Sequence, residues 1–216
     1  RPAFSWKELG IELRGHRVRV LKRSYRNTTE ILKTAYALIR DEEFLREEDG
    51  SVAEPELEYQ QARHGPLPIV MGRADASHEI QDVADEIKRL LQSGYQASDI
   101  LLTTFHRHTT DRIARQLMTQ EIKAAVNDGN GAFGSDTVAV STLHSSKGME
   151  YRVVFVCGLN ELAHVHDDEE LAQNKRLLYV GMTRARERLY LSYHGIAPEW
   201  ALAKILPVLE AMAQGK

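Results

Sequence analysis

Polar side chains crowd a short segment between two apolar stretches of the sequence. TVAVST at Thr137–Thr142 and RVVFVC at Arg152–Cys157 have the valine-rich composition of buried strands. The loop between them carries hydroxyl, imidazole, ammonium and carboxylate groups, from Thr142, His144, Ser145, Ser146, Lys147, Gly148 and Glu150. Open α/β sheets bind ligands where such loops leave the carboxyl ends of core strands. We therefore expect a binding site at this loop.

Two arginines add a second kind of chemistry. Arg26 stands between a predicted strand and a predicted helix, and Arg184 lies in the run MTRAR. A guanidinium is permanently charged and matches two phosphate oxygens at once. Two fixed arginines suit the terminal group of a triphosphate, where they offset charge that develops during phosphoryl transfer. Taken singly, each has a plainer explanation: Arg26 could pair with the acidic stretch that follows, and Arg184 could be solvated.

Strands and helices must alternate to position these groups. We expect strands at 17–21, 67–71, 99–105, 122–126, 137–142, 152–157 and 188–193, and helices at 28–40, 77–92, 107–120, 170–186 and 198–213. This order predicts a doubly wound α/β sheet. Gly181, inside the helix at 170–186, costs about 1 kcal/mol relative to Ala and predicts a closely packed neighbouring backbone. The acidic stretch at 41–68 is expected to be a mobile connection or, alternatively, a segment that binds a partner protein.

The chain has no phosphate-binding glycine loop of its own. GNGAFG at 129–134 matches G-x-G-x-x-G, but a strand follows it rather than a helix. We interpret it as a glycine-rich surface connection, and no G-x-x-x-x-G-K-[ST] occurs. HVHDD at 164–168 is interpreted as a solvated loop rather than a metal cluster. We expect no metal site in this chain.

Composition limits the remaining classes. With 216 residues and a net charge of −3, the chain is one large or two small globular domains, and nucleic acid could be bound only through a local patch. No apolar run reaches the roughly 18 residues that span a bilayer. The single cysteine, Cys157, excludes an intrachain disulfide and predicts a reducing, cytoplasmic location. RPAFSWKELG is no signal peptide, and we expect the chain to begin inside a longer protein.

Three separated pieces carry a family resemblance. LKRSYRNTTEILKTAYALI, VSTLHSSKGMEY and RLLYVGMTRARERL are similar, in order, to motifs IV, V and VI of UvrD/Rep-type superfamily 1 DNA helicases. FSWKELGI near the start resembles the segment that follows motif III of that family. The resemblance spans nearly the whole chain, and motifs V and VI together are highly specific.

The resemblance implies a fold and a nucleotide site. Residues 1–216 would form the second RecA-like motor domain, a P-loop NTPase-type three-layer α/β fold with a mostly parallel sheet between helices and no Walker A of its own. Arg26 and Arg184 would be the catalytic pair that reaches the ATP γ-phosphate across a cleft, and Gly148 and Glu150 would hold the ribose. The first motor domain of the same full-length protein would supply the Mg²⁺ ligands.

The same resemblance implies the nucleic-acid contacts. Thr142 and His144 would touch the backbone of single-stranded DNA, with Ser146 and Lys147 in the same DNA-binding loop. The full-length protein would be an ATP-dependent DNA helicase or translocase with a role in DNA repair, and the chain alone would be inactive. No membrane contact is expected.

Some residues depart from the family pattern. Gln173 and Asn174 are uncharged where the family is usually acidic, and TTFH at 103–106 replaces an element that often ends in a DNA-contacting arginine. The segment between Arg26 and Thr142 leaves no room for a large accessory subdomain. Two alternatives stay open: a non-catalytic nucleic-acid or protein-interaction module that keeps the fold, and a helicase linked to a nuclease.

Overall fold

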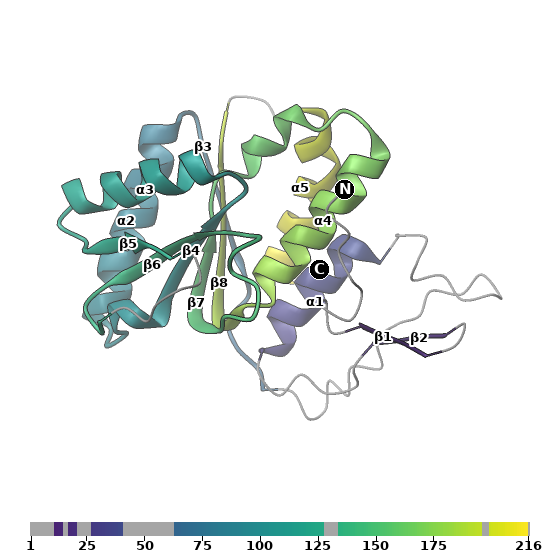
Figure 1. Ribbon diagram of the computed structural model, residues 1–216, viewed down its shortest axis with the longest axis horizontal. Coiled ribbons are helices and arrows are strands. Elements are labelled where there is room, and N and C mark those ends of the chain that lie inside the picture. Colours follow the sequence, from purple (N-terminus) through teal and green to yellow (C-terminus); the bar gives the residue numbers. More distant parts are fainter. Residues whose placement is uncertain are drawn as a thin grey trace.

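Six parallel strands form the central sheet of this computed structural model (Figure 1), which describes residues 11–14, 17–20, 27–40, 63–127, 134–195 and 199–215. The order across the sheet is β3-β8-β7-β4-β6-β5, and every neighbouring pair is parallel. These strands are β3 (Ile69–Arg73), β4 (Ile100–Thr104), β5 (Ala124–Val126), β6 (Val138–Thr142), β7 (Tyr151–Val156) and β8 (Ala185–His194). A separate antiparallel pair consists of β1 (Ile11–Arg14) and β2 (Arg17–Val20).

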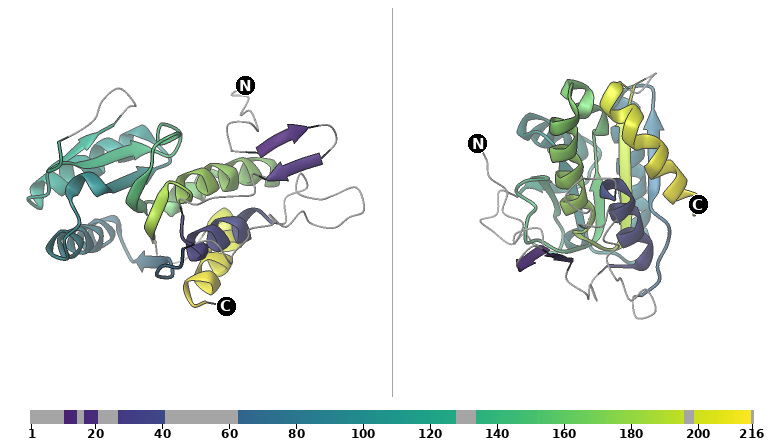
Figure 2. Two further views of the ribbon diagram at one scale, coloured as in Figure 1. Left: turned by 90° about the horizontal axis from the view of Figure 1, so that it is seen from below. Right: turned by 90° about the vertical axis from the view of Figure 1, so that its right-hand side faces the viewer.

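Helices cover both faces of the sheet, as an all-parallel sheet requires. They are α1 (Thr29–Ile39), α2 (Ala76–Gln92), α3 (Arg107–Thr119), α4 (Asp168–Met182) and α5 (Trp200–Ala213), with 3₁₀ turns η3 (Ala97–Asp99) and η4 (Leu159–His164). Figures 1 and 2 show α2 and α3 on one side and α1, α4 and α5 on the other. The predicted three-layer RecA-like architecture is therefore confirmed. No helix in the described residues has the length and apolar character needed to cross a membrane.

Alternating side chains along the strands fill two separate cores. In β4, Leu101 packs with α1, α4 and α5, while Ile100 and Leu102 pack with α2 and α3. In β7, Val154 and Phe155 divide in the same way, and all of these side chains are fully buried. Successive strand residues point to opposite faces, so a strand covered on both sides is apolar throughout.

The helices begin at capping side chains that the sequence supplies. Thr28 precedes α1, and its hydroxyl accepts a hydrogen bond from the Ile31 amide at 3.5 Å. Asp75 precedes α2 and accepts from the main chain of the first turn, and Asp167 caps α4 through the Glu170 amide at 2.7 Å. Each cap satisfies an amide that the helix itself leaves without a partner.

The main error of the sequence prediction concerns the end of α4. The helix expected at 170–186 spans Asp168–Met182, and β8 begins at Ala185, three residues before the predicted strand. The Thr183 hydroxyl donates to the Tyr179 carbonyl at 2.9 Å and so closes the last turn. Arg184 therefore lies in a turn, whereas the sequence predicted it on a helix.

Smaller differences have local causes. β3 begins at Ile69 instead of Leu67, and Pro66 and Pro68, which have no amide hydrogen, precede it. HVHDD at 164–168 includes the last residue of η4 and the first residue of α4. The glycine-rich stretch at 129–134 and the acidic stretch at 41–68 lie mostly outside the described residues, so their interpretation stays a prediction.

Parallel strands give the sheet two chemically distinct edges. At the carboxyl edge, β4 and β6 end side by side at Thr104 and Thr142. At the amino edge, β7 and β8 begin side by side at Tyr151 and Ala185. The segment 143–150 connects the carboxyl end of β6 with the amino end of β7 and skips β4, which lies between them. This segment therefore reaches both edges.

Candidate functional site

Arg184 lies at the amino edge, in the turn between α4 and β8. Its carbonyl accepts a hydrogen bond from the Tyr151 amide at 3.0 Å, which joins the turn to the start of β7. Its guanidinium is half-buried and donates from Nε to the Val180 carbonyl at 2.9 Å and from Nη1 to the Met149 carbonyl at 3.3 Å. These bonds hold the guanidinium beside the main chain that links Gly148 and Glu150.

Gly148 and Glu150 are both exposed at this edge. Gly148 has φ +80°, a conformation that side chains with a Cβ rarely adopt. A Cβ added there would meet no atom within 4 Å, so the backbone conformation requires glycine while the space beside it is open. A nucleotide sugar would have room at this position, with the Glu150 carboxylate as a hydrogen-bond acceptor for its hydroxyls.

The predicted DNA contacts lie at the carboxyl edge and along the connecting segment. The Thr142 hydroxyl donates to Ser145 Oγ at 3.0 Å and accepts from the Ser145 amide at 3.1 Å, which shapes the turn after β6. His144 and Lys147 are exposed. Ser146 is fully buried, and its hydroxyl donates to the Leu143 carbonyl at 2.7 Å. The Ser146 hydroxyl therefore stabilises the turn. A contact between Ser146 and DNA stays a prediction.

The predicted residues thus form two groups. Arg184, Gly148 and Glu150 come together at the amino edge, whereas Thr142 and the turn that follows lie at the carboxyl edge. The predicted role of Arg26 concerns a residue outside the described ranges. Asn27, its neighbour in sequence, is described and is buried.

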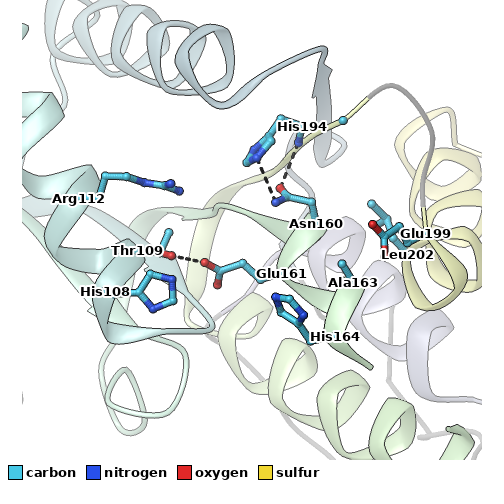
Figure 3. Close-up of a pocket in the computed structure, with 11 residues that line it drawn as sticks. His108, Thr109, Arg112, Asn160, Glu161, Ala163, His164, His194, Glu199 and Leu202 are labelled. Atoms are coloured by element: carbon cyan, nitrogen blue, oxygen red, sulfur yellow. Dashed lines mark hydrogen bonds between the residues drawn. The ribbon is translucent and has the colours of Figure 1, made fainter. Parts of the chain in front are cut away.

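A pocket of about 380 Å³, which the sequence did not predict, opens at the carboxyl edge (Figure 3). Its lining comes from α3, from η4 after β7, from the end of β8 and from α5, and includes His108, Thr109, Arg112, Asn160, Glu161, His164, His194 and Glu199. The Thr109 hydroxyl donates to Glu161 Oε1, while Glu161 Oε2 is buried without a hydrogen-bond partner in the described part of the chain. The Thr109 hydroxyl thus holds the Glu161 carboxylate in the wall, and Arg112 adds an exposed cation.

A buried carboxylate supports the wall of this pocket. Glu79 of α2 is 4% exposed, and its Oε1 accepts from the Ser192 hydroxyl at 2.5 Å and the Gly158 amide at 3.0 Å. Its Oε2 lies 2.5 Å from His194 Nδ1, and His194 Nε2 lies 3.2 Å from the Asn160 amide nitrogen. If Nδ1 carries the proton, Nε2 accepts from Asn160, so one chain of hydrogen bonds joins α2, β8 and η4.

Cys157 lies next to this network, but its thiol is unreactive. Burial, with the negative charge of Glu79 as a second cause, raises the pKa of its thiol far above the ordinary value. The thiol stays protonated and packs as a small core side chain.

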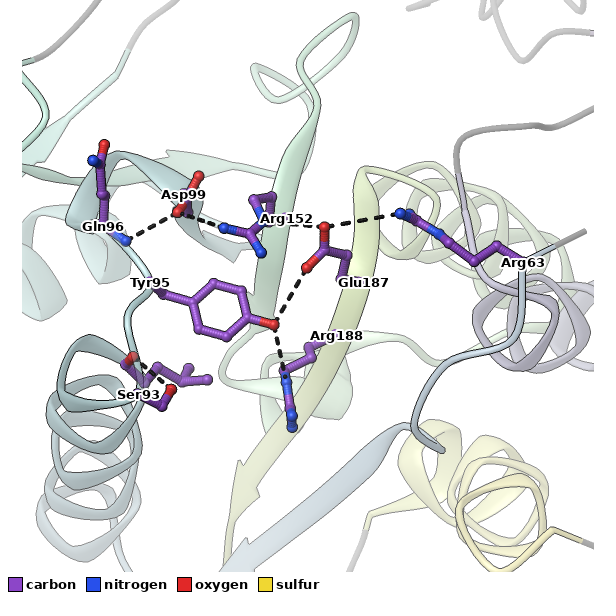
Figure 4. A network of polar contacts seen from close by, with 9 residues as sticks. Arg63, Ser93, Tyr95, Gln96, Asp99, Arg152, Glu187 and Arg188 are labelled. Atoms are coloured by element: carbon purple, nitrogen blue, oxygen red, sulfur yellow. Dashed lines mark hydrogen bonds and ion pairs between the residues drawn. The ribbon is translucent and has the colours of Figure 1, made fainter.

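A second polar network occupies the amino edge (Figure 4). Arg152 at the start of β7 pairs with Glu187 of β8 at 3.0 Å and with Asp99 at 3.2 Å, and its guanidinium lies 4.5 Å from the centre of the Tyr95 ring. Tyr95 in turn accepts from Arg188 Nε at 3.3 Å. Burial alone would raise the pKa of Glu187, but the hydrogen bond and charge of Arg152 outweigh it and lower that pKa. Arg188 therefore belongs to a structural network.

Within the described ranges, no three His, Cys, Asp or Glu side chains gather in a way that could hold a metal ion. His164 lines the pocket, and Asp167 and Asp168 begin α4. His164, His166, Asp167 and Asp168 are exposed, as the solvated-loop interpretation of HVHDD predicts.

Comparison with known proteins places the chain among helicase domains. The family model described as the UvrD-like helicase C-terminal domain matches residues 19–136 and 127–195. The chain is 39% identical over 79 residues to the ATP-dependent DNA helicase UvrD1 of Mycobacterium tuberculosis. The aligned residues make up 34% of this chain and 10% of that relative. It is 35% identical over 115 residues to the ATP-dependent DNA helicase srs2 of Schizosaccharomyces pombe. That alignment covers 52% of this chain and 13% of the relative. The chain thus matches about a tenth of the length of these relatives.

A solved structure agrees with the fold. The crystal structure of the C-terminal domain of a possible DNA helicase from Lactobacillus plantarum WCFS1 matches 87% of this chain and 97% of that one, with a TM-score of 0.63 and 17% identity. At this identity the similarity concerns the fold alone.

Proposed function

Because the chain belongs to the UvrD-like helicase C-terminal domain family, we propose that it is the second motor domain of an ATP-dependent DNA helicase or translocase. Its relatives are named ATP-dependent DNA helicases, and the chain matches only about a tenth of their length. The proposed activity is accordingly that of a larger protein, in which a first RecA-like motor domain faces the amino edge of this sheet.

One observation carries the nucleotide part of the proposal. Arg184 Nη1 lies 3.3 Å from the carbonyl of Met149, the residue between Gly148 and Glu150. A cation and a sugar-binding carboxylate on neighbouring segments suit a nucleotide whose phosphates lie towards Arg184. Arg184 and Arg26 would bind the γ-phosphate and offset charge in the transition state, while Glu150 would accept from the ribose hydroxyls.

The DNA part rests on the opposite end of the same segment. Thr142 and His144 lie where the segment leaves β6, and Lys147 is exposed farther along it. A displacement of the segment when the two motor domains close on ATP would move these side chains together with Gly148 and Glu150. This shared segment would couple ATP binding to DNA movement, and the Ser146 hydroxyl would preserve its shape.

The pocket at the carboxyl edge extends the proposed DNA path. It lies at the carboxyl edge of the sheet, at which β6 also ends in Thr142, and is large enough for one nucleotide. The exposed guanidinium of Arg112 suits a backbone phosphate. A protein that tracks a single strand combines such contacts without reading sequence.

The chain supplies only part of the chemistry. ATP hydrolysis also needs a Mg²⁺ ion, for which the first motor domain would provide the ligands and the phosphate-binding loop. The purified chain alone should therefore show no ATP turnover. Residues 127–137 are all that separates β5 from β6, which agrees with a compact motor domain that has no large insertion there.

The alternative function is a non-catalytic module that binds nucleic acid or protein. The sequence of the full-length protein separates the two: absence of G-x-x-x-x-G-K-[ST] and of an acidic Mg²⁺ motif would favour the module. The direct test is the DNA-stimulated ATPase of the two-domain protein with Arg26→Ala and Arg184→Ala. Loss of kcat with little change in ATP affinity supports contacts made in the transition state.

A further inference from the structure

Asn27 holds the main chain on both sides of Arg184. It follows Arg26 in the sequence, precedes the cap of α1 and is 5% exposed. Its side-chain nitrogen Nδ2 donates to the Thr183 carbonyl at 2.8 Å and to the Ala185 carbonyl at 2.5 Å. A single amide group thus uses both of its N–H bonds on the two residues that flank the arginine.

A third hydrogen bond completes this clamp. The carbonyl of Arg184 itself accepts from the Tyr151 amide at 3.0 Å. Three consecutive carbonyls, from Thr183 to Ala185, are therefore held by donors from two other segments of the chain. They form the turn at which α4 becomes β8.

Asn27 is not needed to attach α1 to the domain. Ile31, Ala35 and Leu38 of this helix are buried in the core shared with α4 and α5, and Thr28 caps it. The Asn27 amide adds something different, namely the position of the peptide groups around Arg184. Because a guanidinium must lie within a fraction of an ångström of its productive place, such a constraint has catalytic consequences.

The residue type fits this task. Asparagine has a short side chain that ends in two N–H donors in one plane. Serine offers one donor, and aspartate offers only acceptors, which would face two carbonyl oxygens. Neither can bridge the Thr183 and Ala185 carbonyls.

We infer that Asn27 is a positioning residue that fixes the turn carrying Arg184. The Arg184 guanidinium then approaches a terminal phosphate from a backbone that the Asn27 amide holds in place. This inference rests on the proposed function, since it gives Arg184 a phosphate to bind.

The test uses the two-domain protein with Asn27→Asp, Asn27→Ser, Arg184→Ala and a matched control, Thr34→Val. Thr34 is fully buried in α1 and donates to the Glu30 carbonyl at 2.8 Å, so the control removes a buried hydrogen bond away from Arg184. Four quantities are measured: kcat, KM for ATP, and the affinities for ADP and for ADP with aluminium fluoride, which mimics the transition state.

Asn27→Asp should lower kcat by about 10²-fold, because misplacement by about 1 Å can cost that much. Affinity for ADP with aluminium fluoride should fall by a similar factor, while KM for ATP and affinity for ADP stay within about threefold. Asn27→Ser, which retains one donor, should lose less, and Thr34→Val should keep wild-type kcat. If Asn27→Asp does not fold, Asn27→Ser is the test variant. A wild-type kcat in Asn27→Ser then overturns the inference.

Two further outcomes separate this inference from the proposed function. Wild-type kcat and fluoride-complex affinity in Asn27→Asp, together with large losses in Arg184→Ala, would overturn the role of Asn27 alone. Unchanged kcat in Arg184→Ala would overturn both. A purely structural role would lower the melting temperature of the Asn27 variants without changing the ratio of the two affinities.

Discussion

The side chain of Leu143, the first residue after β6, packs directly against Gly181 in the last turn of α4. A Cβ added at Gly181 would overlap Leu143 Cδ2, and Leu143 is fully buried. The glycine was predicted to admit a neighbouring backbone, but it admits this leucine side chain instead. The contact joins the segment that carries Thr142, Gly148 and Glu150 to the helix that precedes Arg184.

Gly181→Ala should test this contact. Overpacking costs about 1–3 kcal/mol, and the better helix propensity of Ala returns about 1 kcal/mol, so the free energy of unfolding should fall by about 1 kcal/mol. In a Leu143→Val background, which lacks the overlapping methyl group, the same substitution should be neutral or stabilising. Denaturant unfolding of the wild-type protein, the two single variants and the double variant gives both values. Equal destabilisation in the two backgrounds would show that the contact does not explain the glycine.

The ion pair between Arg152 and Glu187 predicts a pH dependence of stability. Because the pKa of Glu187 is lowered in the folded state, its stabilising effect is present above the unfolded carboxyl pKa of about 4.3 and is lost as pH falls through the folded value. Glu187→Gln should therefore cost about 1 kcal/mol near pH 7 and progressively less below pH 4.3. Unfolding free energies measured from pH 7 to pH 3 check this. A difference between the two proteins that stays constant over this range would contradict it.

Glu79 should be among the most sensitive residues for stability. Glu79→Ala leaves the Ser192 hydroxyl, the Gly158 amide and His194 without their shared acceptor, at a cost of about 3 kcal/mol in the free energy of unfolding. Asp85→Ala, which removes an exposed carboxylate on the same helix, should stay within about 0.5 kcal/mol of wild type. Chemical denaturation compares the two. Similar stabilities for both variants would show that the buried network contributes little.

Arg112 should contribute to DNA affinity without sequence preference. Arg112→Ala in the two-domain protein should weaken binding of single-stranded DNA by about 3- to 10-fold and reduce the salt slope by about 1, because one phosphate contact is lost. Arg115→Ala is the matched control, since this exposed arginine lies on the same helix but does not line the pocket. Fluorescence anisotropy at several salt concentrations measures both. Equal losses in the two variants would reflect net charge alone and remove the pocket from the DNA path.

Local patterns predicted most of the fold. The valine-rich runs at β6 and β7, the apolar spacing of Ile80, Val83 and Ile87 in α2, and the cap at Thr28 all depend on neighbours in sequence. The end of α4 could not be predicted in this way. Met182 and Ala185 continue the apolar stripe of a helix, and the pairing of Ala185 with Tyr151, which is distant in sequence, decides that a strand begins there.

The candidate site also combines residues that local sequence patterns predicted with residues that only the tertiary structure brings together. Motif similarity selected Arg184, Gly148 and Glu150, which meet at one edge, because these residues stand in recognisable runs. It missed Glu79, the pocket and the clamp by Asn27, whose partners come from separate elements. Polar residues after the ends of β4, β7 and β8 were the available signal, but only the strand order brings His108, Asn160 and His194 together.

The DNA-stimulated ATPase of the two-domain protein with Arg184→Ala is the most direct test of Arg184 at the terminal phosphate. An arginine in this role is worth about 10³–10⁵ in rate, so kcat should fall by at least about 10³-fold while KM for ATP changes little. Arg184→Lys should restore little of the loss, because an ammonium cannot match two phosphate oxygens as a guanidinium does. A kcat within about threefold of wild type for Arg184→Ala would contradict the proposed catalytic role.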